Sequence, residues 1–301
     1  MQYKFYKQIL SKFELYDDCI KDENMEIKKP ILLISHELTR TGAPTVLFDL
    51  GCMLKKDGYD VFLVAYSDGK LKDDILNNDM VAVICDKIDK KWLIQLADLF
   101  ELCVVNTLVL TSVIDCMKSQ KINIIWWIHE SEAYFINQYS YYKNICPMPN
   151  LQIVAAGPYV FKMIQQYMGF SVPILNFGVK DLKEKSTKVY SKKVHFVHVG
   201  TMAGDKGQMV LASAIDKLPQ LYMDRAKFTF IGALEYANRG ILKRLINLKD
   251  QYSNVEVLDA MNQKKLFDFY NQTDCIIVSS IVEPTSAVAV EGLMKEKICI
   301  C

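Results

Sequence analysis

Two glutamates in one segment, EPTSAVAVE at residues 283–291, have the types and spacing that most clearly suggest chemistry. Glu283 comes just before a proline and therefore in a loop, whereas Glu291 lies eight positions later, inside the helix that this segment predicts. Two carboxylates placed in this way can accept hydrogen bonds from several hydroxyl groups, as the binding of a sugar or a ribose requires. Backbone N–H groups at the start of such a helix are free to hold an anion. The residues concerned are Thr285, Ser286 and Ala287.

A glycine-rich loop with one lysine precedes another predicted helix, in HVGTMAGDKGQ at residues 198–208. Three glycines loosen this loop: Gly200, Gly204 and Gly207. Lys206 brings a point positive charge close to the start of the helix. That combination suits a diphosphate, because the ammonium group and the positive end of the helix dipole both attract it. An exposed lysine in an ordinary loop is the alternative that this spacing leaves open.

A third segment, SHELTRTGAP at residues 35–44, connects the first predicted strand to a helix expected to begin near Pro44. Gly42 in this loop would let a phosphate or a sugar hydroxyl approach the backbone at the positive end of the helix. A glycine between a strand and a helix is also ordinary turn chemistry, so this signal is not specific by itself.

A fourth segment, WWIHE at residues 126–130, places His129 at the carboxyl end of a predicted strand. Open α/β sheets bind their ligands at these ends, which makes His129 a candidate for the edge of a binding site. A histidine whose ring is satisfied by local backbone hydrogen bonds is the alternative.

The elements that must position these motifs are short apolar runs that alternate with amphipathic helical segments. The runs are continuous, which is typical of strands buried on both faces of a parallel sheet. A representative helix covers residues 44–56, where apolar side chains recur on one face. The strands predicted in the first half are 31–35, 60–66, 81–85, 102–106, 122–128 and 151–156.

A lysine-rich segment with almost no apolar residues, 180–193, interrupts this pattern and is predicted to be a solvated linker. The alternation then starts again, which predicts two Rossmann-like lobes with a cleft between them. The expected organisation is an N-terminal extension at 1–29, a first lobe at 30–179, the linker, and a second lobe at 194–301. The second lobe is predicted to contain strands 194–200, 227–232, 254–259, 274–280 and 297–301 and helices 208–218, 239–249 and 263–271.

Composition excludes several classes of protein. Lys and Arg number 36 against 35 Asp and Glu, a net charge of +1, whereas a nucleic-acid-binding protein usually has a clear basic excess. The longest charge-free apolar stretch, residues 102–114, is too short to cross a bilayer, and the N-terminus does not resemble a signal peptide. The nine cysteines include no CxxC pair, so we expect reduced thiols in the cytoplasm and no metal site.

Several common catalytic motifs are also missing from the sequence. It contains no GxG, which disfavours dinucleotide binding, and no GxSxG nucleophile motif. Asp205 stands where a phosphate-binding Walker loop would have its second glycine. His36 and His129 are each followed by a glutamate, but neither has the second histidine of a zinc-protease helix.

The four segments, in this order on two Rossmann-like lobes, resemble the retaining glycosyltransferases of the GT-B fold, in particular the large GT4 family. The resemblance covers roughly residues 30–301. It implies an α/β fold of two doubly wound parallel-sheet lobes with an interlobe cleft. The N-terminal lobe would hold the acceptor, and the C-terminal lobe would hold a nucleotide sugar.

This resemblance implies a role for each candidate residue. Glu283 would face the hydroxyl groups of the transferred sugar, and Glu291 would face the ribose of the nucleotide. Lys206 would neutralise the diphosphate. His129 would contact the donor sugar at the reaction centre, and Gly42 would approach phosphate and acceptor. His129, Glu283 and Lys206 are therefore the expected catalytic residues.

The chain departs from the family pattern at two places. Many relatives carry a second phosphate-binding arginine after the glycine that corresponds to Gly200, where this chain has Thr201. Ser286 stands where a glycine is common in the family. The residues expected to bind the nucleotide sugar are Gly42, Gly200, Thr201, Lys206, Thr285, Ser286, Ala287 and Glu291.

The implied reaction moves a sugar from a nucleotide-diphosphate sugar to an acceptor hydroxyl with retention of configuration, in surface polysaccharide or glycoconjugate synthesis. The resemblance implies that this reaction needs no metal ion and no cofactor, since the nucleotide-diphosphate sugar is itself the donor substrate. The acceptor would be a carbohydrate, a lipid-linked oligosaccharide or a protein. A cytoplasmic location is expected, and peripheral association with the inner face of the plasma membrane stays open. The aromatic-rich extension could dock on a membrane or a partner, although packing on its own domain is favoured.

Two other functions stay open at this stage. One is a catalytically silent glycosyltransferase-like subunit that stabilises an active partner. The other is a GT-B enzyme of a different type, such as a nucleotide-sugar 2-epimerase or a phosphorylase. Since relatives continue beyond the strand predicted at 297–301, the resemblance also leads us to expect a truncated C-terminal lobe with impaired activity.

Overall fold

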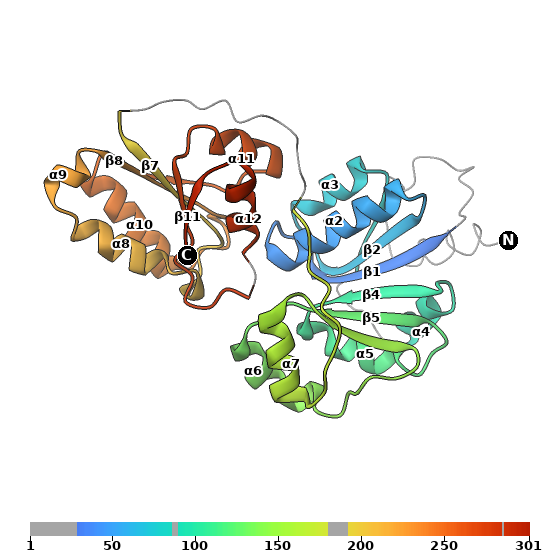
Figure 1. Ribbon diagram of the computed structural model, residues 1–301. Coiled ribbons are helices and arrows are strands. Elements are labelled where there is room, and N and C mark those ends of the chain that lie inside the picture. Colours follow the sequence, from blue (N-terminus) through green and yellow to red (C-terminus); the bar gives the residue numbers. More distant parts are fainter. Residues whose placement is uncertain (1–28, 86–89, 180–191, 285) are drawn as a thin grey trace. The chain divides into compact units, whose positions relative to one another are not determined.

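The computed structural model describes residues 29–85, 90–179, 192–284 and 286–301. The chain forms two compact units, which divide between Gly178 and Val179. In each unit helices surround a sheet (Figure 1). Most of the predicted extension, 1–28, and most of the predicted linker, 180–191, lie outside the described residues.

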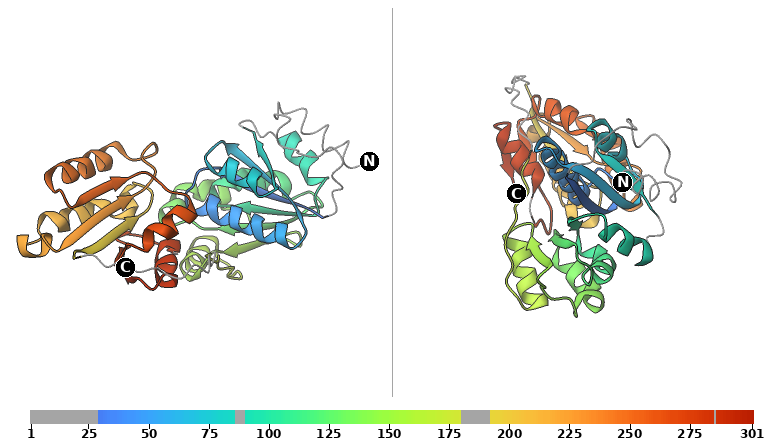
Figure 2. Two further views of the ribbon diagram at one scale, coloured as in Figure 1. Left: turned by 90° about the horizontal axis from the view of Figure 1, so that it is seen from above. Right: turned by 90° about the vertical axis from the view of Figure 1, so that its right-hand side faces the viewer.

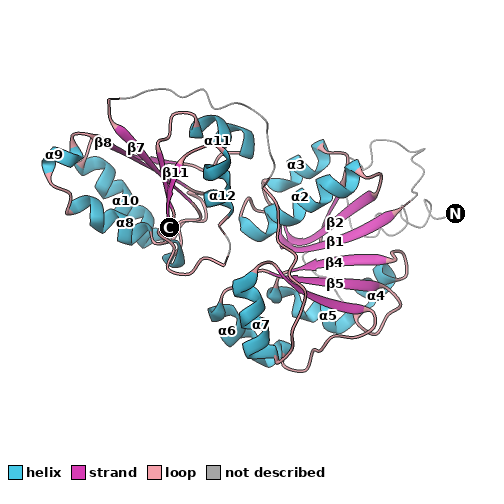
Figure 3. Ribbon diagram, in the orientation of Figure 1, coloured by secondary structure: helices cyan, strands magenta, loops and turns pink. Residues whose placement is uncertain are grey.

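The N-terminal unit contains a six-stranded sheet with the order β3-β2-β1-β4-β5-β6. Figure 3 shows the central strands β2, β1, β4 and β5 in this order. Every neighbouring pair of strands is parallel. Each strand that the sequence predicts in this half is present. The strands are β1 Pro30–Glu37, β2 Asp60–Ser67, β3 Val81–Ile84, β4 Leu102–Asn106, β5 Asn123–Ile128 and β6 Leu151–Ala155.

Helices connect these strands because a parallel pair requires a long crossover connection. The first helix, α2, begins at Gly42 rather than near Pro44. Pro44 fits the first turn, because the N–H group that proline lacks would have no partner within the helix there. The helical segments are α2 Gly42–Lys56, α3 Leu71–Asn77, α4 Lys90–Ala97, η3 Leu108–Leu110, α5 Thr111–Met117, α6 Glu132–Tyr142 and α7 Pro158–Met168.

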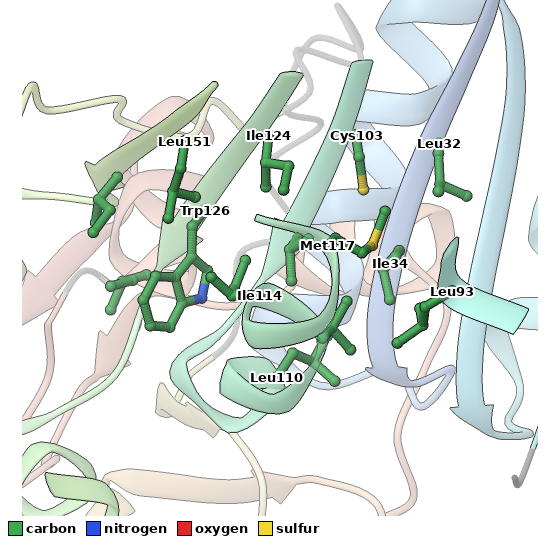
Figure 4. Close-up of a cluster of buried hydrophobic side chains, with 14 of the residues drawn as sticks. Leu32, Ile34, Leu93, Cys103, Leu110, Ile114, Met117, Ile124, Trp126 and Leu151 are labelled. Carbon is green, nitrogen blue, oxygen red and sulfur yellow. The ribbon is translucent and has the colours of Figure 1, made fainter. Parts of the chain in front are cut away.

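Alternate residues of β1 enter two different cores, because successive side chains of a strand point to opposite faces of the sheet. Leu32 and Ile34 pack in one core, and Ile31 and Leu33 pack in the other. Figure 4 shows the first core, where Trp126 of β5 lies beside side chains from the neighbouring strands and from α5. Burial on both faces is the reason why these strands read as continuous apolar runs.

The C-terminal unit repeats this architecture with a five-stranded parallel sheet of order β11-β10-β7-β8-β9. The left view of Figure 2 shows strands of this unit between its helices. The strands are β7 Val194–Val199, β8 Ala226–Ile231, β9 Val255–Leu258, β10 Cys275–Ile277 and β11 Ile298–Ile300. The helical segments are η4 Gly204–Lys206, α8 Gln208–Asp216, α9 Gln220–Met223, α10 Arg239–Gln251, α11 Gln263–Tyr270 and α12 Ala287–Met294.

One predicted strand of this unit is shorter than expected. The apolar run at 274–280 predicted a strand of that length, but β10 ends at Ile277. Beyond it the chain leaves the sheet, because Ser279 donates its hydroxyl to the carbonyl of Gly207 at 3.0 Å. The amide of Ile281 donates to the carbonyl of Asp205 at 2.8 Å. These bonds attach the end of the run to the loop after β7.

Both sheets reverse their strand order at one position, which is where open α/β sheets bind ligands. The reversal lies between β1 and β4 in the N-terminal unit and between β7 and β10 in the C-terminal unit. The segments containing Gly42, Lys206 and Glu283 follow β1, β7 and β10, and His129 follows β5 next to β4. The topology therefore places the predicted motifs at or beside these positions.

Trp126 provides a test of the first core. Its side chain is fully buried, and its indole N–H donates to the carbonyl of Thr107 at 2.8 Å. We expect Trp126→Ala to lower the free energy of unfolding by about 3–5 kcal/mol, because it leaves a cavity that the core cannot refill. Urea denaturation followed by circular dichroism measures this loss.

Met53→Ala is the control, since Met53 on α2 is 63% exposed. We expect this variant to stay within about 0.5 kcal/mol of the wild type. Equal losses in the two variants would show that Trp126 is not a core residue.

Candidate functional site

Two loops of the C-terminal unit meet at the carboxyl ends of β7 and β10. Gly207 makes this possible, because its φ of +71° is a left-handed conformation that suits glycine. A Cβ atom at this position would also collide with the carbonyl oxygen of Ser279. The loops are therefore in direct backbone contact although they lie about seventy residues apart in the chain.

An ion pair joins these loops. The ammonium group of Lys206 lies 3.0 Å from Oε2 of Glu283, and the hydroxyl of Ser280 donates to the same oxygen at 2.9 Å. The two charged side chains are 27% and 23% exposed, so both remain accessible from the solvent. A lysine ammonium has three N–H donors, and a carboxylate accepts at two oxygens. The pair can therefore bind hydroxyl groups and an anion next to each other.

A buried histidine forms a hydrogen bond with the backbone of Lys206. His198 of β7 donates its Nε2–H to the carbonyl of Lys206 at 3.0 Å, since a carbonyl can only accept. Burial lowers the pKa of His198, which keeps its ring neutral in this role. The sequence pattern HVGTMAGDK contained this histidine, but its spacing gave no sign of the contact.

Glu291 lies inside helix α12, as predicted, but it is buried. The hydroxyl of Tyr270, at the end of α11, donates to its Oε2 at 3.1 Å. Burial and this carboxylate together raise the pKa of Tyr270 well above its usual value, so the phenol stays protonated and can donate. Sequence reasoning missed Tyr270, because the two residues are twenty-one positions apart on different helices.

Ser286 caps α12 by accepting the amide N–H of Ala289 at 3.1 Å. This N–H group is not one of those at residues 285–287 that the sequence assigned to an anion. Ala287 is the first residue of the helix. Thr285, the remaining residue of this prediction, lies outside the described residues.

Gly200 and Thr201 lie directly after β7. The amide of Gly200 donates to the carbonyl of Ile231 at 3.0 Å, and the carbonyl of Thr201 accepts from the side chain of Gln208 at 2.8 Å. A Cβ atom at Gly200 would make only ordinary contacts, the nearest at 3.8 Å. Packing within the unit therefore does not require glycine there.

In the N-terminal unit, Gly42 begins helix α2 directly after the loop that follows β1. A Cβ atom at Gly42 would meet nothing within 4 Å, so glycine is not required by packing among the described residues. The side-chain amide of Asn106, the last residue of β4, donates to the carbonyl of Ala43 at 2.8 Å. This bond fixes the start of α2 next to the strand at which the sheet order reverses.

His129 follows β5, as predicted, and packs between aromatic side chains. Its ring centroid lies 4.6 Å from that of Trp127 and 6.4 Å from that of Phe177. Burial lowers its pKa to about 3, so the imidazole is neutral near pH 7. Its Nε2 atom is buried and has no hydrogen-bond partner among the described residues.

Glu130 is a buried carboxyl group that the sequence reasoning did not select. Its Oε1 accepts the amide N–H of Leu108 at 2.6 Å, and its Oε2 accepts that of His129 at 2.9 Å. Burial raises its pKa to about 7, although these N–H groups oppose the shift. The sequence showed it only as the second residue of an incomplete zinc-protease motif.

The structure thus brings some of the predicted residues together. Lys206 and Glu283 are in contact, and Gly42 and His129 lie on the carboxyl side of the N-terminal sheet. Within the described ranges, no group of three or more His, Cys, Asp or Glu side chains could hold a metal ion. No helix in this part of the chain has the length and apolar character needed to span a bilayer.

Comparison with protein families gives a match for each unit. Residues 27–159 match the family described as glycosyl-transferase family 4, and residues 179–301 match glycosyl transferases group 1. Taken together these matches span most of the chain, and each unit matches a glycosyltransferase domain. A comparison with curated protein sequences finds no match.

Solved structures of similar fold include proteins described as glycosyltransferases. HepE of Anabaena in complex with UDP-glucose is 15% identical and gives a TM-score of 0.73, covering 90% of this chain and 80% of that one. Sucrose-phosphate synthase of Thermosynechococcus elongatus is 13% identical with a TM-score of 0.69 and covers 90% and 80%. A glycosyltransferase of Rickettsia africae is 15% identical with a TM-score of 0.64 and covers 90% and 78%. At these identities the comparison shows the GT-B fold.

Gly207 provides a test of the loop contact. We expect Gly207→Ala to destabilise the C-terminal unit by at least about 1–2 kcal/mol, the cost of a left-handed conformation with a Cβ atom. Displacement of Ser279 adds to this cost. Gly204→Ala on the same loop is the control, since a Cβ there meets nothing within 4 Å. Urea denaturation compares the two, and similar midpoints would contradict the assigned contact.

His129 predicts a dependence of stability on pH. The unfolded chain takes up a proton near pH 6.5, whereas the folded ring does so only near pH 3. Between these values the free energy of unfolding falls as the pH falls, by at most about 1.4 kcal/mol per pH unit. An asparagine side chain does not titrate, so His129→Asn should lack this contribution when unfolding is measured at several pH values.

Glu130 contributes with the opposite sign between pH 4.5 and about 7, because its folded pKa is raised. Glu130 is present in the wild type and in His129→Asn, so its contribution cancels in the difference between their free energies of unfolding. Parallel stability profiles of wild type and His129→Asn between pH 4.5 and 6.5 would show that the ring is not held neutral.

Proposed function

We propose that this chain transfers a glycosyl group from a nucleotide-diphosphate sugar to an acceptor hydroxyl, with retention of configuration and without an essential metal ion. The single observation that carries the proposal is the pair of Lys206 and Glu283, which lie 3.0 Å apart where the C-terminal sheet reverses its order. The two domain matches and the GT-B neighbours support the same class of reaction.

The chemistry follows from what these groups can stabilise. In such a transfer the diphosphate leaves with negative charge while the anomeric carbon becomes positively charged. Lys206 would stabilise the leaving diphosphate through a preorganised charge, which takes the place of a divalent cation. Glu283 would accept hydrogen bonds from the sugar hydroxyls. No side chain is assigned as a nucleophile, so the leaving phosphate itself would help to take the proton of the acceptor on the same face.

Each of the other candidates has a proposed role within its own unit. Glu291, oriented by Tyr270, would accept hydrogen bonds from the ribose. His129 would contact the donor sugar as a neutral imidazole. Gly42 would let phosphate or acceptor approach the start of α2, where packing leaves room.

The donor to test first is UDP-glucose, because HepE of Anabaena was solved in complex with it. Acceptors to test are carbohydrates, lipid-linked oligosaccharides and proteins. The proposed reaction is a step in the synthesis of a surface polysaccharide or a glycoconjugate. The proposed location is the cytoplasm. Addition of a chelator should leave turnover unchanged if the reaction needs no metal.

Substitution of the ion pair tests the assignment. We expect Lys206→Ala and Glu283→Ala each to lower kcat by roughly 100- to 1000-fold, as the loss of a preorganised charge does. Both side chains are partly exposed, so the pair contributes at most about 1 kcal/mol to stability and the variants should fold. Turnover with a radiolabelled nucleotide sugar and thermal unfolding measure the two effects.

The same unit offers a matched control pair. Lys227 lies 3.0 Å from Glu256, on neighbouring strands and away from the two loops. Lys227→Ala and Glu256→Ala remove the same charges, and they should keep turnover close to that of the wild type. Normal turnover in Lys206→Ala or Glu283→Ala would overturn the proposal. Failure of calorimetry to detect any nucleotide sugar would favour the silent-subunit alternative.

A further inference from the structure

The corner between β4 and η3 has an unusual backbone. Thr107 has a φ of +81°, a left-handed conformation that is uncommon for residues other than glycine. Its amide donates to the carbonyl of Trp127 at 2.8 Å, and its own carbonyl accepts the indole N–H of Trp126 at 2.8 Å. The corner is thus attached to β5 by two bonds, one through the amide and one through the carbonyl of Thr107.

Glu130 supplies the third attachment. Its carboxyl group is buried and accepts the amide of Leu108, in the turn after Thr107, and the amide of His129. The amides of Val109 and of Glu130 itself also face it. One side chain therefore satisfies N–H groups of two segments about twenty residues apart and fixes them against each other.

The segments that Glu130 joins carry buried polar atoms without partners. These atoms are Oδ1 of Asn106, Oγ1 of Thr107 and Nε2 of His129, and none has a hydrogen bond among the described residues. Buried polar groups usually have a partner, so such atoms indicate groups kept for a ligand or a bound water. All three lie at the carboxyl ends of β4 and β5, next to the reversal of strand order.

We propose that Glu130 is a positioning residue of the transferase site, which holds His129 and the corner at Thr107 in the geometry needed for transfer. It touches no substrate and acts through His129. The inference rests on the proposed function, because that function gives His129 its contact with the donor sugar. A carboxylate suits this task because it accepts on both oxygens, whereas a glutamine would turn an NH₂ group towards one of the amides.

Glu130→Gln is the variant that tests this role, since it keeps the size of the side chain. Glu132→Gln is the matched control: it removes a carboxylate two residues away, which accepts the hydroxyl of Tyr167 of α7 at 2.7 Å. We expect Glu130→Gln to lower kcat about 10- to 100-fold and to leave KM for the donor within about twofold, because the geometry of transfer changes more than binding. Glu132→Gln should leave both values unchanged.

A double-variant cycle separates positioning from general stability. If Glu130 acts through His129, the variant that combines Glu130→Gln with His129→Ala should be no slower than His129→Ala alone. The inference would be overturned if the loss of kcat in the double variant equals the product of the losses in the two single variants. Unchanged turnover in Glu130→Gln would also overturn it.

Hydrogen exchange decides the structural part without any assay of activity. At least one of the amides of Leu108 and His129 should lose protection by about tenfold or more in Glu130→Gln, because the NH₂ group of the glutamine faces one of them in place of an acceptor oxygen, and both should keep it in Glu132→Gln. Unchanged protection would overturn the inference even in an active enzyme. If the wild type transfers no sugar to any acceptor, the proposed function fails, and the exchange result still decides whether Glu130 holds the corner.

Discussion

The C-terminal unit depends on the close backbone approach of the loops that follow β7 and β10. Gly207 permits this approach because it takes a left-handed conformation and leaves no side chain in the way of Ser279. Once the loops touch, Lys206 and Glu283 come within 3.0 Å of each other. The two groups are then adjacent: an ammonium group that can stabilise a leaving diphosphate, and a carboxylate that can accept hydrogen bonds from a sugar. The buried ring of His198 keeps the lysine backbone in position.

In the N-terminal unit a buried carboxyl group fixes two segments at strand ends against each other. Glu130 gathers backbone amides of two strand ends, and its raised pKa of about 7 shows how far burial opposes its charge. Beside it, burial lowers the pKa of His129 to about 3. The two neighbours thus shift in opposite directions for the same reason, since burial disfavours the charged form of each. Both units use the reversal of strand order to present polar groups at the carboxyl edge of a parallel sheet.

Much of the fold could be predicted because parallel strands buried on both faces leave continuous apolar runs. The strand at 274–280 was predicted too long, since its apolar character continues past Ile277 where the chain already leaves the sheet to bind the loop after β7. The start of α2 was placed near Pro44, but the helix begins at Gly42 because proline is compatible with a first turn. Such boundaries depend on hydrogen bonds to distant segments, which a local pattern does not contain.

The sequence by itself determined the architecture of two α/β units and the chemical types at their strand ends. Periodicity, glycines and charges are local properties of the chain. Only the tertiary structure decided which of these residues meet: that Lys206 pairs with Glu283, that Tyr270 donates to Glu291, and that Glu130 joins two strand ends. The physical reason is that ion pairing, burial and pKa shifts depend on distances in space, and strand order rather than sequence separation sets those distances.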